Sequence, residues 1–205
     1  MMRKKPMLAY PVSTKPIDYS KPVFIQPKLD GVRCVIQYEK VNSFAGEVKA
    51  YSRTGKEWKN INHILTDLVP FFKKHPNIIL DGELYNHDLK DDFEQIISLV
   101  RRQKPDDIDM LESADMVQFH CYDIIDEELL YDQRNEFINQ SLMLLGDSIH
   151  IVDTESVLTE LGSKMFHENN LKDGYEGSIV RTNDVYKCGR SWSLRKFKDF
   201  SDAEA

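Results

Sequence analysis

The chain has 205 residues, 27 of them basic and 34 acidic, for a formal net charge of −7, and 41% of its residues are hydrophobic. This length suits one domain, which would bury roughly 70% of the surface that its unfolded chain exposes. No apolar run approaches the roughly 18 residues that a membrane helix needs, and the first residues hold no apolar stretch typical of a signal peptide. These observations argue against secretion and against membrane insertion.

The cysteines and the net charge bear on compartment and partners. Cys34, Cys121 and Cys188 are odd in number, far apart and in no Cys-x-x-Cys spacing. This pattern argues against a disulfide framework and a structural zinc site, so we expect a reducing, cytoplasmic compartment. The net charge of −7 argues weakly against nucleic acid binding, but it hides where the charges lie.

The N-terminal part of the chain is rich in proline. Five prolines within residues 6–27 predict an irregular arm over residues 1–22, which leads into a first strand at 23–28. Apolar alternation resumes at 32–38. The Leu-Asp-Gly between these two strands predicts a hairpin or a tight bend, which leaves Lys28 at the end of a strand.

Short strands and helices then alternate to the end of the chain. Further strands are predicted at 47–53, 78–80, 117–125, 177–181 and 192–197. Helices are predicted at 61–72, 93–100, 132–145 and 154–169. An acidic stretch at 106–115 is predicted to be a solvated loop or a short helix. This pattern, without an internal repeat, indicates an α+β fold of largely antiparallel sheets.

One segment near the C-terminus is clearly cationic. Residues 186–198, YKCGRSWSLRKFK, carry five basic residues and no acid, so a polyphosphate or a nucleic acid backbone can bind there. We expect the two tryptophans, Trp58 and Trp192, to be core residues.

A Lys-x-Asp-Gly-x-Arg sequence from Lys28 to Arg33 is the first motif that points to chemistry. Alone it is only suggestive, because an exposed hairpin with a surface lysine is the alternative interpretation. Three further segments follow in order: LDGELY at 80–85, EGSIVR at 176–181 and RKFK at 195–198. The joint occurrence of these segments by chance is negligible.

In this order the segments resemble the nucleotidyltransferase motifs of ATP-dependent DNA ligases, RNA ligases and messenger RNA capping guanylyltransferases. Capping enzymes usually carry Asp-Gly where this chain has Glu176-Gly177, and their next strand tends to end in threonine rather than in Arg181. SRTGK at 52–56, HCYDII at 120–125 and the C-terminal KDFSDAEA are similar to small phage and viral DNA ligases. The details favour a DNA ligase; an RNA ligase, a capping guanylyltransferase and a non-catalytic nucleic acid clamp are the alternatives.

The resemblance implies a nucleotidyltransferase (ATP-grasp-like) domain over residues 1–205, with sheets flanked by helices. It implies ATP, held as covalent AMP, with Mg²⁺ or Mn²⁺, and nicked duplex DNA as the partner. Such ligases normally continue into an OB-fold domain of roughly 100 residues, which we expect to be missing from this chain. We therefore expect a monomer that binds ATP but needs a C-terminal OB-fold domain for full sealing activity.

The chemistry explains why lysines occupy these motifs. A lysine amine forms a phosphoramidate that can pass the nucleotide on, and the resemblance assigns this role to Lys28. An ordinary lysine is protonated at neutral pH, so burial and nearby cations have to lower its pKa. Lys196 and Lys198 are the expected cations, and they would also hold the α-phosphate oxygens as charge develops.

The remaining residues implied by the resemblance bind nucleotide, metal or DNA. Glu83 is expected beside the ribose and, with Glu176, as an oxygen ligand of the metal. Arg33 is expected at the ribose hydroxyls, Asp30 as a support of the turn, and Tyr122 as the aromatic residue that stacks on adenine. Gln26 is expected to read the adenine amino group, although an amide both donates and accepts and so discriminates weakly against guanine. The DNA backbone is assigned to arginines and one lysine: Arg53 at the 5′-phosphate of the nick, Arg190 and Lys187.

Overall fold

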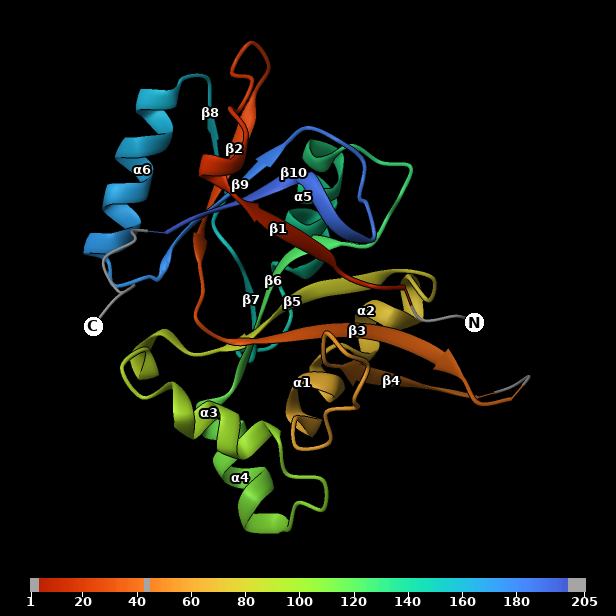
Figure 1. Ribbon diagram of the computed structural model, residues 1–205. Helices are drawn as coiled ribbons and strands as arrows, with labels where there is room; N and C mark the ends of the chain where they lie inside the picture. Colours follow the sequence, from red (N-terminus) through yellow and green to blue (C-terminus); the bar gives the residue numbers. More distant parts are fainter. Residues whose placement is uncertain (1–3, 43–44, 199–205) are drawn as a thin grey trace.

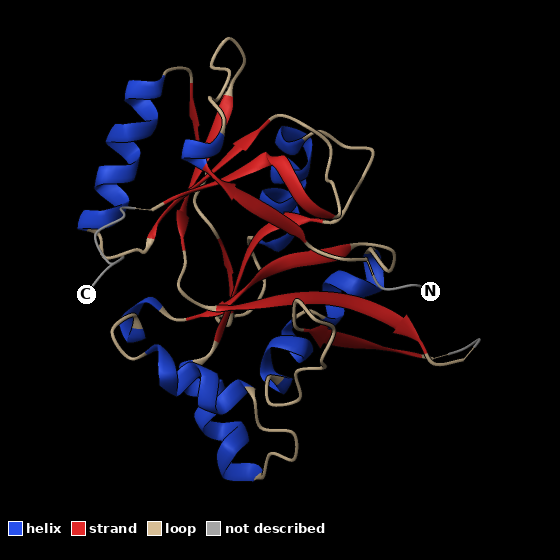
Figure 2. Ribbon diagram, viewed as in Figure 1, coloured by secondary structure: helices blue, strands red, loops and turns tan. Residues whose placement is uncertain are grey.

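The computed structural model describes residues 4–42 and 45–198, and it contains two five-stranded sheets (Figures 1 and 2). The first sheet has the order β1-β10-β9-β2-β8. Its strands are β1 (Met7–Pro11), β2 (Val23–Lys28), β8 (Glu155–Val157), β9 (Gly177–Thr182) and β10 (Gly189–Phe197). The second sheet has the order β4-β3-β5-β6-β7. Its strands are β3 (Val32–Lys40), β4 (Gly46–Tyr51), β5 (Ile79–Tyr85), β6 (Gln118–Ile124) and β7 (Ile149–Ile151).

Helices flank both sheets. The α-helices are α1 (Asn62–Asp67), α2 (Val69–Lys74), α3 (Phe93–Val100), α4 (Asp107–Met116), α5 (Tyr131–Leu142) and α6 (Glu160–Lys172). α6 packs on β2 and β9 of the first sheet, α5 packs on β6 and β7 of the second, and α3 packs against α4 (Figure 1). Only β1 with β10 and β6 with β7 pair in parallel among the described strands, so the α+β fold with largely antiparallel sheets is confirmed.

The chain crosses from one sheet to the other directly after Lys28. β2 belongs to the first sheet and β3 to the second, so the Leu-Asp-Gly turn is a tight bend between sheets, and the hairpin interpretation is wrong. A Cβ on Gly31 would lie 2.5 Å from the Glu83 side chain and 2.6 Å from the carbonyl of Leu84, so only glycine fits where the bend passes β5. The crossing leaves Lys28 at the junction of the two sheets, opposite Gly177 of β9.

Two apolar clusters hold this arrangement together. The larger one fills the space between the second sheet and its helices, and Ile36, Leu80 and Phe119 are completely buried there. A smaller cluster joins the sheets to each other: Met7 and Leu194 come from the first sheet, and Val35 and Ile79 come from the second. Apolar burial therefore fixes one end of the junction between the sheets.

Three local predictions are wrong in instructive ways. Residues 7–11 of the expected irregular arm form an edge strand, because Pro6 precedes the strand and Pro11 ends it, so that no proline interrupts its interior. The helix expected at 61–72 is split into α1 and α2, because Pro70, in the first turn of α2, donates no backbone N–H. Residues 155–157 form β8, and α6 begins after Thr159, whose hydroxyl accepts from the Gly162 N–H at 3.0 Å.

No helix in the described part of the chain is long and apolar enough to cross a bilayer.

Candidate nucleotide-binding site

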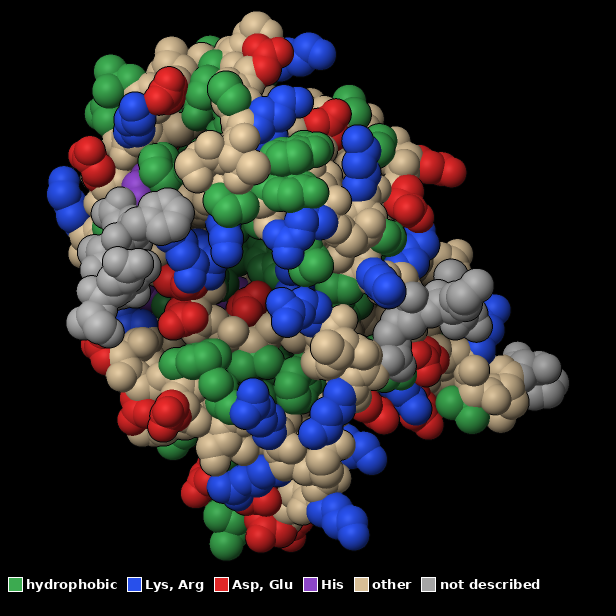
Figure 3. All heavy atoms as spheres, in the orientation of Figure 1, with side chains coloured by type: hydrophobic (Ala, Val, Ile, Leu, Met, Phe, Trp, Pro, Cys, Tyr) green, Lys and Arg blue, Asp and Glu red, His purple; other side chains and the backbone are tan. Residues whose placement is uncertain are grey.

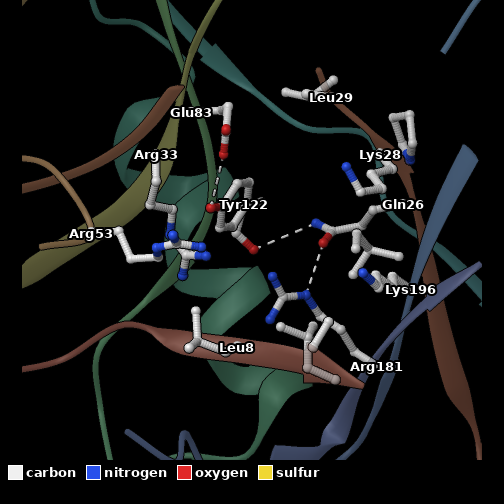
Figure 4. A pocket seen from close by; sticks show the side chains of 14 residues that line it. Leu8, Gln26, Lys28, Leu29, Arg33, Arg53, Glu83, Tyr122, Arg181 and Lys196 are labelled. Carbon is white, nitrogen blue, oxygen red and sulfur yellow. Dashed lines mark hydrogen bonds between the residues drawn. The ribbon is translucent and has the colours of Figure 1, made fainter. Parts of the chain in front are cut away.

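A cavity of about 250 Å³ lies where the two sheets meet. Strands of both sheets and the loop after β4 supply its lining, and seven of the predicted site residues are among the residues that line it: Gln26, Lys28, Arg33, Arg53, Glu83, Tyr122 and Lys196 (Figure 4). Figure 3 shows that Lys and Arg side chains surround the hollow on this face of the molecule. The lining therefore combines five cationic side chains with one half-buried carboxylate, Glu83, which suits a phosphorylated ligand.

Glu176 links two lysines beside the cavity. Its carboxylate forms ion pairs with Lys28 and with Lys198, and its backbone N–H donates to the Lys28 carbonyl at 3.2 Å. Burial lowers the pKa of Lys28, and it outweighs the opposing effect of the Glu83 and Asp30 charges. Burial and the nearby Lys28 lower the pKa of Lys198. Three of the predicted site residues, Lys28, Lys198 and Glu176, thus lie together in three dimensions.

Glu83 lies on the opposite wall, on β5. Burial raises its pKa to about 7, although Arg33 and Lys28 act in the other direction. Tyr122 on β6 donates its phenol O–H to Glu83 at 3.2 Å, and burial raises the pKa of this phenol. The Tyr122 ring also has the guanidinium carbons of Arg33 and Arg181 at 5.1 and 5.4 Å. A base stacked on this ring would join or replace those cations.

Arg33 is held by an aspartate that the sequence reasoning did not single out. Its Nε donates to Asp81 at 2.6 Å and its second contact to the same carboxylate makes the pair bidentate. The Tyr186 hydroxyl donates to Asp81 at 2.6 Å, and the Arg33 guanidinium also reaches the Met7 carbonyl at 3.2 Å. Arg33 therefore lines the cavity from a fixed position.

A second buried network was also missed. Asp123 is completely buried between two arginines: Arg134 Nε donates to it at 2.7 Å, and Arg181 Nη1 donates at 2.7 Å. Arg181 Nε in turn donates to the Gln26 side-chain oxygen at 2.8 Å. Asp123 and Arg181 share one signal that would have revealed them, because each is the single charged residue of its strand, whereas Asp81 shares β5 with Glu83.

The expected DNA contacts fall in different places. Arg53 is exposed at the rim and lines the cavity, whereas Lys187 and Arg190 are exposed on the segment before and at the start of β10, away from the lining. The Arg190 guanidinium lies 5.4 Å from the Tyr10 ring and donates to the Ala9 carbonyl at 2.9 Å. We find a single cavity contact among these three residues.

The two tryptophans differ. Trp58 is buried as predicted, but Trp192 is 42% exposed and stacks on Tyr10 with ring centroids 3.8 Å apart, so its assignment to the core is wrong. Strand alternation explains this, because Ser191 and Ser193 take the inward positions on either side of it.

The fold is that of a nucleotidyltransferase domain. Residues 6–198 match the family described as "ATP dependent DNA ligase domain", and the chain belongs to this family. The DNA ligase of African swine fever virus (isolate Pig/Kenya/KEN-50/1950) is 28% identical over 195 residues, which cover 91% of this chain and 44% of that protein. The chain thus spans less than half the length of this viral relative.

Solved structures show the same fold. The ATP-dependent DNA ligase of bacteriophage T7 in complex with ATP has a TM-score of 0.72 at 18% identity, covering 95% of this chain and 68% of that chain. The Chlorella virus DNA ligase-adenylate has a TM-score of 0.68 at 22% identity, covering 98% of this chain and 69% of that chain. The predicted resemblance and the predicted fold class are confirmed.

Proposed function

We propose that this chain is the adenylation domain of an ATP-dependent DNA ligase and that Lys28 carries the nucleotide. The observation that carries the proposal is the placement of Lys28: it lies at the junction of the sheets with a side chain that is 20% exposed, and burial lowers its pKa. Lys196 lines the same cavity, and Lys198 pairs with Glu176 beside it. A desolvated lysine amine is the nucleophile that such chemistry needs.

The first step forms lysyl-AMP. The neutral Lys28 Nζ attacks the α-phosphorus of ATP, an N–P bond forms, the P–O bond to pyrophosphate breaks, and the amine loses a proton to solvent. Lys196 lines the cavity and Lys198 lies across Glu176 from Lys28, so both cations are placed to stabilise negative charge on the α-phosphate oxygens.

In the second and third steps the nucleotide leaves Lys28. An oxygen of the 5′-phosphate at a nick attacks the phosphorus of lysyl-AMP, and the N–P bond breaks to restore the amine. The 3′-hydroxyl oxygen then attacks the 5′-phosphate, and AMP departs as the phosphodiester forms. Arg53 at the cavity rim is the cation best placed to hold the 5′-phosphate, and Arg190 and Lys187 would contact the backbone farther out.

The carboxylates suit a divalent ion that is shared with the substrate. The described residues include no cluster of three or more His, Cys, Asp or Glu side chains that could hold a metal alone. Mg²⁺ usually takes one or two protein carboxylates together with substrate phosphates, and Glu176, with Glu83 on the opposite wall, fits that pattern. A bound Mg²⁺ would add positive charge near the α-phosphate, while Arg33 and Tyr122 position the ribose and the base.

Mass spectrometry of the purified chain after incubation with ATP or GTP tests the proposal. A mass increase equal to AMP with ATP alone, abolished in Lys28→Ala and in Lys28→Arg, is the expected result, because a guanidinium stays protonated at working pH. Label retained by Lys28→Ala would place the nucleophile elsewhere. Offering nicked DNA and nicked RNA to the labelled chain then separates a DNA ligase from an RNA ligase, and attachment of GMP would indicate a capping enzyme.

A further inference from the structure

The side-chain amide of Gln26 is fully engaged on the side away from the cavity. Its nitrogen donates to Thr154 Oγ1 at 2.9 Å and to the Tyr122 carbonyl at 3.4 Å, and its oxygen accepts from Arg181 Nε at 2.8 Å (Figure 4). The residue is 2% exposed, yet it lines the cavity. A guanidinium can only donate hydrogen bonds. If the Gln26 amide rotated by half a turn, its NH₂ group would face the N–H groups of Arg181, and donor would meet donor.

The role of Thr154 follows from its own hydrogen bonds. Its hydroxyl donates to the Val152 carbonyl at 3.1 Å, so its oxygen is left to accept from Gln26. Both N–H groups of the amide therefore have acceptors. Within residues 4–42 and 45–198, Arg181 alone donates to the Gln26 side-chain oxygen, and that oxygen keeps one lone pair for a ligand.

The network behind Gln26 is rigid. Arg181 is 4% exposed and is held by Asp123, which is itself completely buried and shared with Arg134. An amide that turned over would oppose its N–H groups to those of Arg181 and its oxygen to the acceptors of Thr154 and Tyr122, which would leave buried polar groups unpaired. The orientation of the Gln26 amide is thus built into the wall of the cavity.

We propose that Arg181 and Thr154 are positioning residues that make Gln26 an acceptor-only reader of the 6-position of the purine. This inference rests on the proposed function. Adenine presents an amino donor at this position, whereas guanine and hypoxanthine present an oxygen acceptor. A glutamine that turns freely accepts from adenine or donates to a 6-oxopurine equally well. The fixed glutamine acts as a carboxylate would, and it rejects the 6-oxopurines.

The test compares ATP with ITP, because hypoxanthine has the 6-oxo group without the 2-amino group of guanine. Thr154→Val removes the nearer acceptor of the Gln26 nitrogen, so one of the hydrogen bonds that hold the amide in this orientation is lost, whereas Thr154→Ser keeps a hydroxyl there. We expect the preference for ATP over ITP, measured as a ratio of kcat/KM for attachment, to fall about tenfold in Thr154→Val and to stay unchanged in Thr154→Ser. The test substitutes Thr154 and not Arg181, because Arg181 also forms an ion pair with the buried Asp123.

Repeating Thr154→Val in the Gln26→Glu variant separates an effect of amide orientation from a general distortion of the cavity. In Gln26→Glu the reader has no N–H, so adding Thr154→Val to it leaves the ATP to ITP ratio unchanged. Equal ratios in the wild type and Thr154→Val, or an equal fall in both backgrounds, would overturn the inference. Dissociation constants for ATP and ITP, measured calorimetrically on Lys28→Ala with and without Thr154→Val, report the same preference without a covalent step. Failure of attachment alone would therefore count against the proposed function and not against this inference.

Discussion

Lys28 and Glu176 form an ion pair although 148 residues separate them in the sequence. Because Glu176 also pairs with Lys198, two lysines beside the cavity share its single negative charge. Glu176→Gln keeps the volume of the side chain but removes this charge. We expect attachment of AMP to slow by about tenfold or more at ordinary Mg²⁺, with partial rescue at high Mg²⁺, since a metal ligand is lost.

The same substitution should change the fold little. The three side chains are partly exposed, and ion pairs in such positions contribute about 1 kcal/mol or less to the free energy of unfolding. Magnesium titrations of attachment and urea unfolding check the two effects separately. Glu155→Gln, at an exposed glutamate of β8, is the control. Full activity of Glu176→Gln at ordinary Mg²⁺ would remove Glu176 from the metal site.

The Arg33 and Asp81 pair should behave in the opposite way. Asp81 is 1% exposed and neutralises Arg33 inside the wall. Asp81→Asn leaves a buried guanidinium without its counter-charge, which typically lowers the free energy of unfolding by about 3–5 kcal/mol. Urea unfolding measures this loss. Asp91→Asn, an exposed aspartate, should stay within about 0.5 kcal/mol of the wild type, and a loss no larger than that for Asp81→Asn would contradict the prediction.

His120 should make the fold sensitive to acid. Burial and the charges of His150 and His87 lower its pKa to about 3, and its ring stacks on that of His150 at 4.7 Å. The unfolded chain takes up this proton near pH 6.5 and the folded chain does not, so stability is full above pH 6.5 and is lost as the pH falls. The loss from this group reaches up to about 2 kcal/mol at pH 5.

Urea unfolding between pH 7.5 and pH 5 checks this prediction through its slope with pH. His120→Gln should lose less stability over that range than the wild type, whatever its stability at pH 7.5. His75→Gln removes a histidine outside this stack and serves as the control. Parallel pH dependences for the wild type and His120→Gln would show that the proton is taken up elsewhere.

The sequence predicts strands well where the pattern is local, and it misses what depends on distant pairing. The first strand at 23–28 is confirmed to the residue as β2, because its apolar alternation is bounded by turn residues. The Leu-Asp-Gly turn signals only that the chain changes direction. Whether the next strand joins the same sheet is decided by pairing of β3 with β5, which lies more than 40 residues farther along the chain. This crossing makes the cavity, so the shape of the site was not predictable.

The motif residues were predictable and their supports were not. Seven of the predicted site residues do line one cavity, since the motifs are short and each places its polar side chains at a strand end or on one strand face. Asp123 and Arg181 are visible in the sequence as the single charges of their strands, whereas Asp81 shares its strand with Glu83. Which carboxylate meets which arginine follows only from the packing of the two sheets, and Asp123 in fact serves both Arg134 and Arg181.

Tyr122 offers a direct test of the base pocket. Tyr122→Leu removes the ring that lines the cavity, and loss of base stacking should weaken binding of ATP by about 1–3 kcal/mol. Tyr122→Phe keeps the ring and removes only the hydrogen bond to Glu83, so it should bind ATP within about 1 kcal/mol of the wild type. Calorimetric titration with ATP measures both. An unchanged affinity in Tyr122→Leu would make Tyr122 a packing residue.

Arg53 and Arg190 should contribute to DNA binding in different ways, because only Arg53 lines the cavity that holds Lys28. If Arg53 holds the 5′-phosphate of the nick, Arg53→Ala weakens binding to a 5′-phosphorylated nick and leaves binding to a 5′-hydroxyl nick nearly unchanged. Arg190→Ala removes an exposed cation outside the cavity, so it weakens binding to the 5′-phosphorylated nick and to the 5′-hydroxyl nick equally. The association constant for DNA falls as the salt concentration rises, and each arginine that contacts a phosphate adds about 0.9 to the steepness of log K against log salt concentration. Arg53→Ala and Arg190→Ala should each reduce this steepness by about that amount. Fluorescence anisotropy from 50 to 200 mM salt measures affinity and slope together, with Lys73→Ala at the exposed end of α2 as the control. Equal effects of Arg53→Ala on the two nicks would place Arg53 on the general backbone surface and leave the 5′-phosphate to another cation of the cavity.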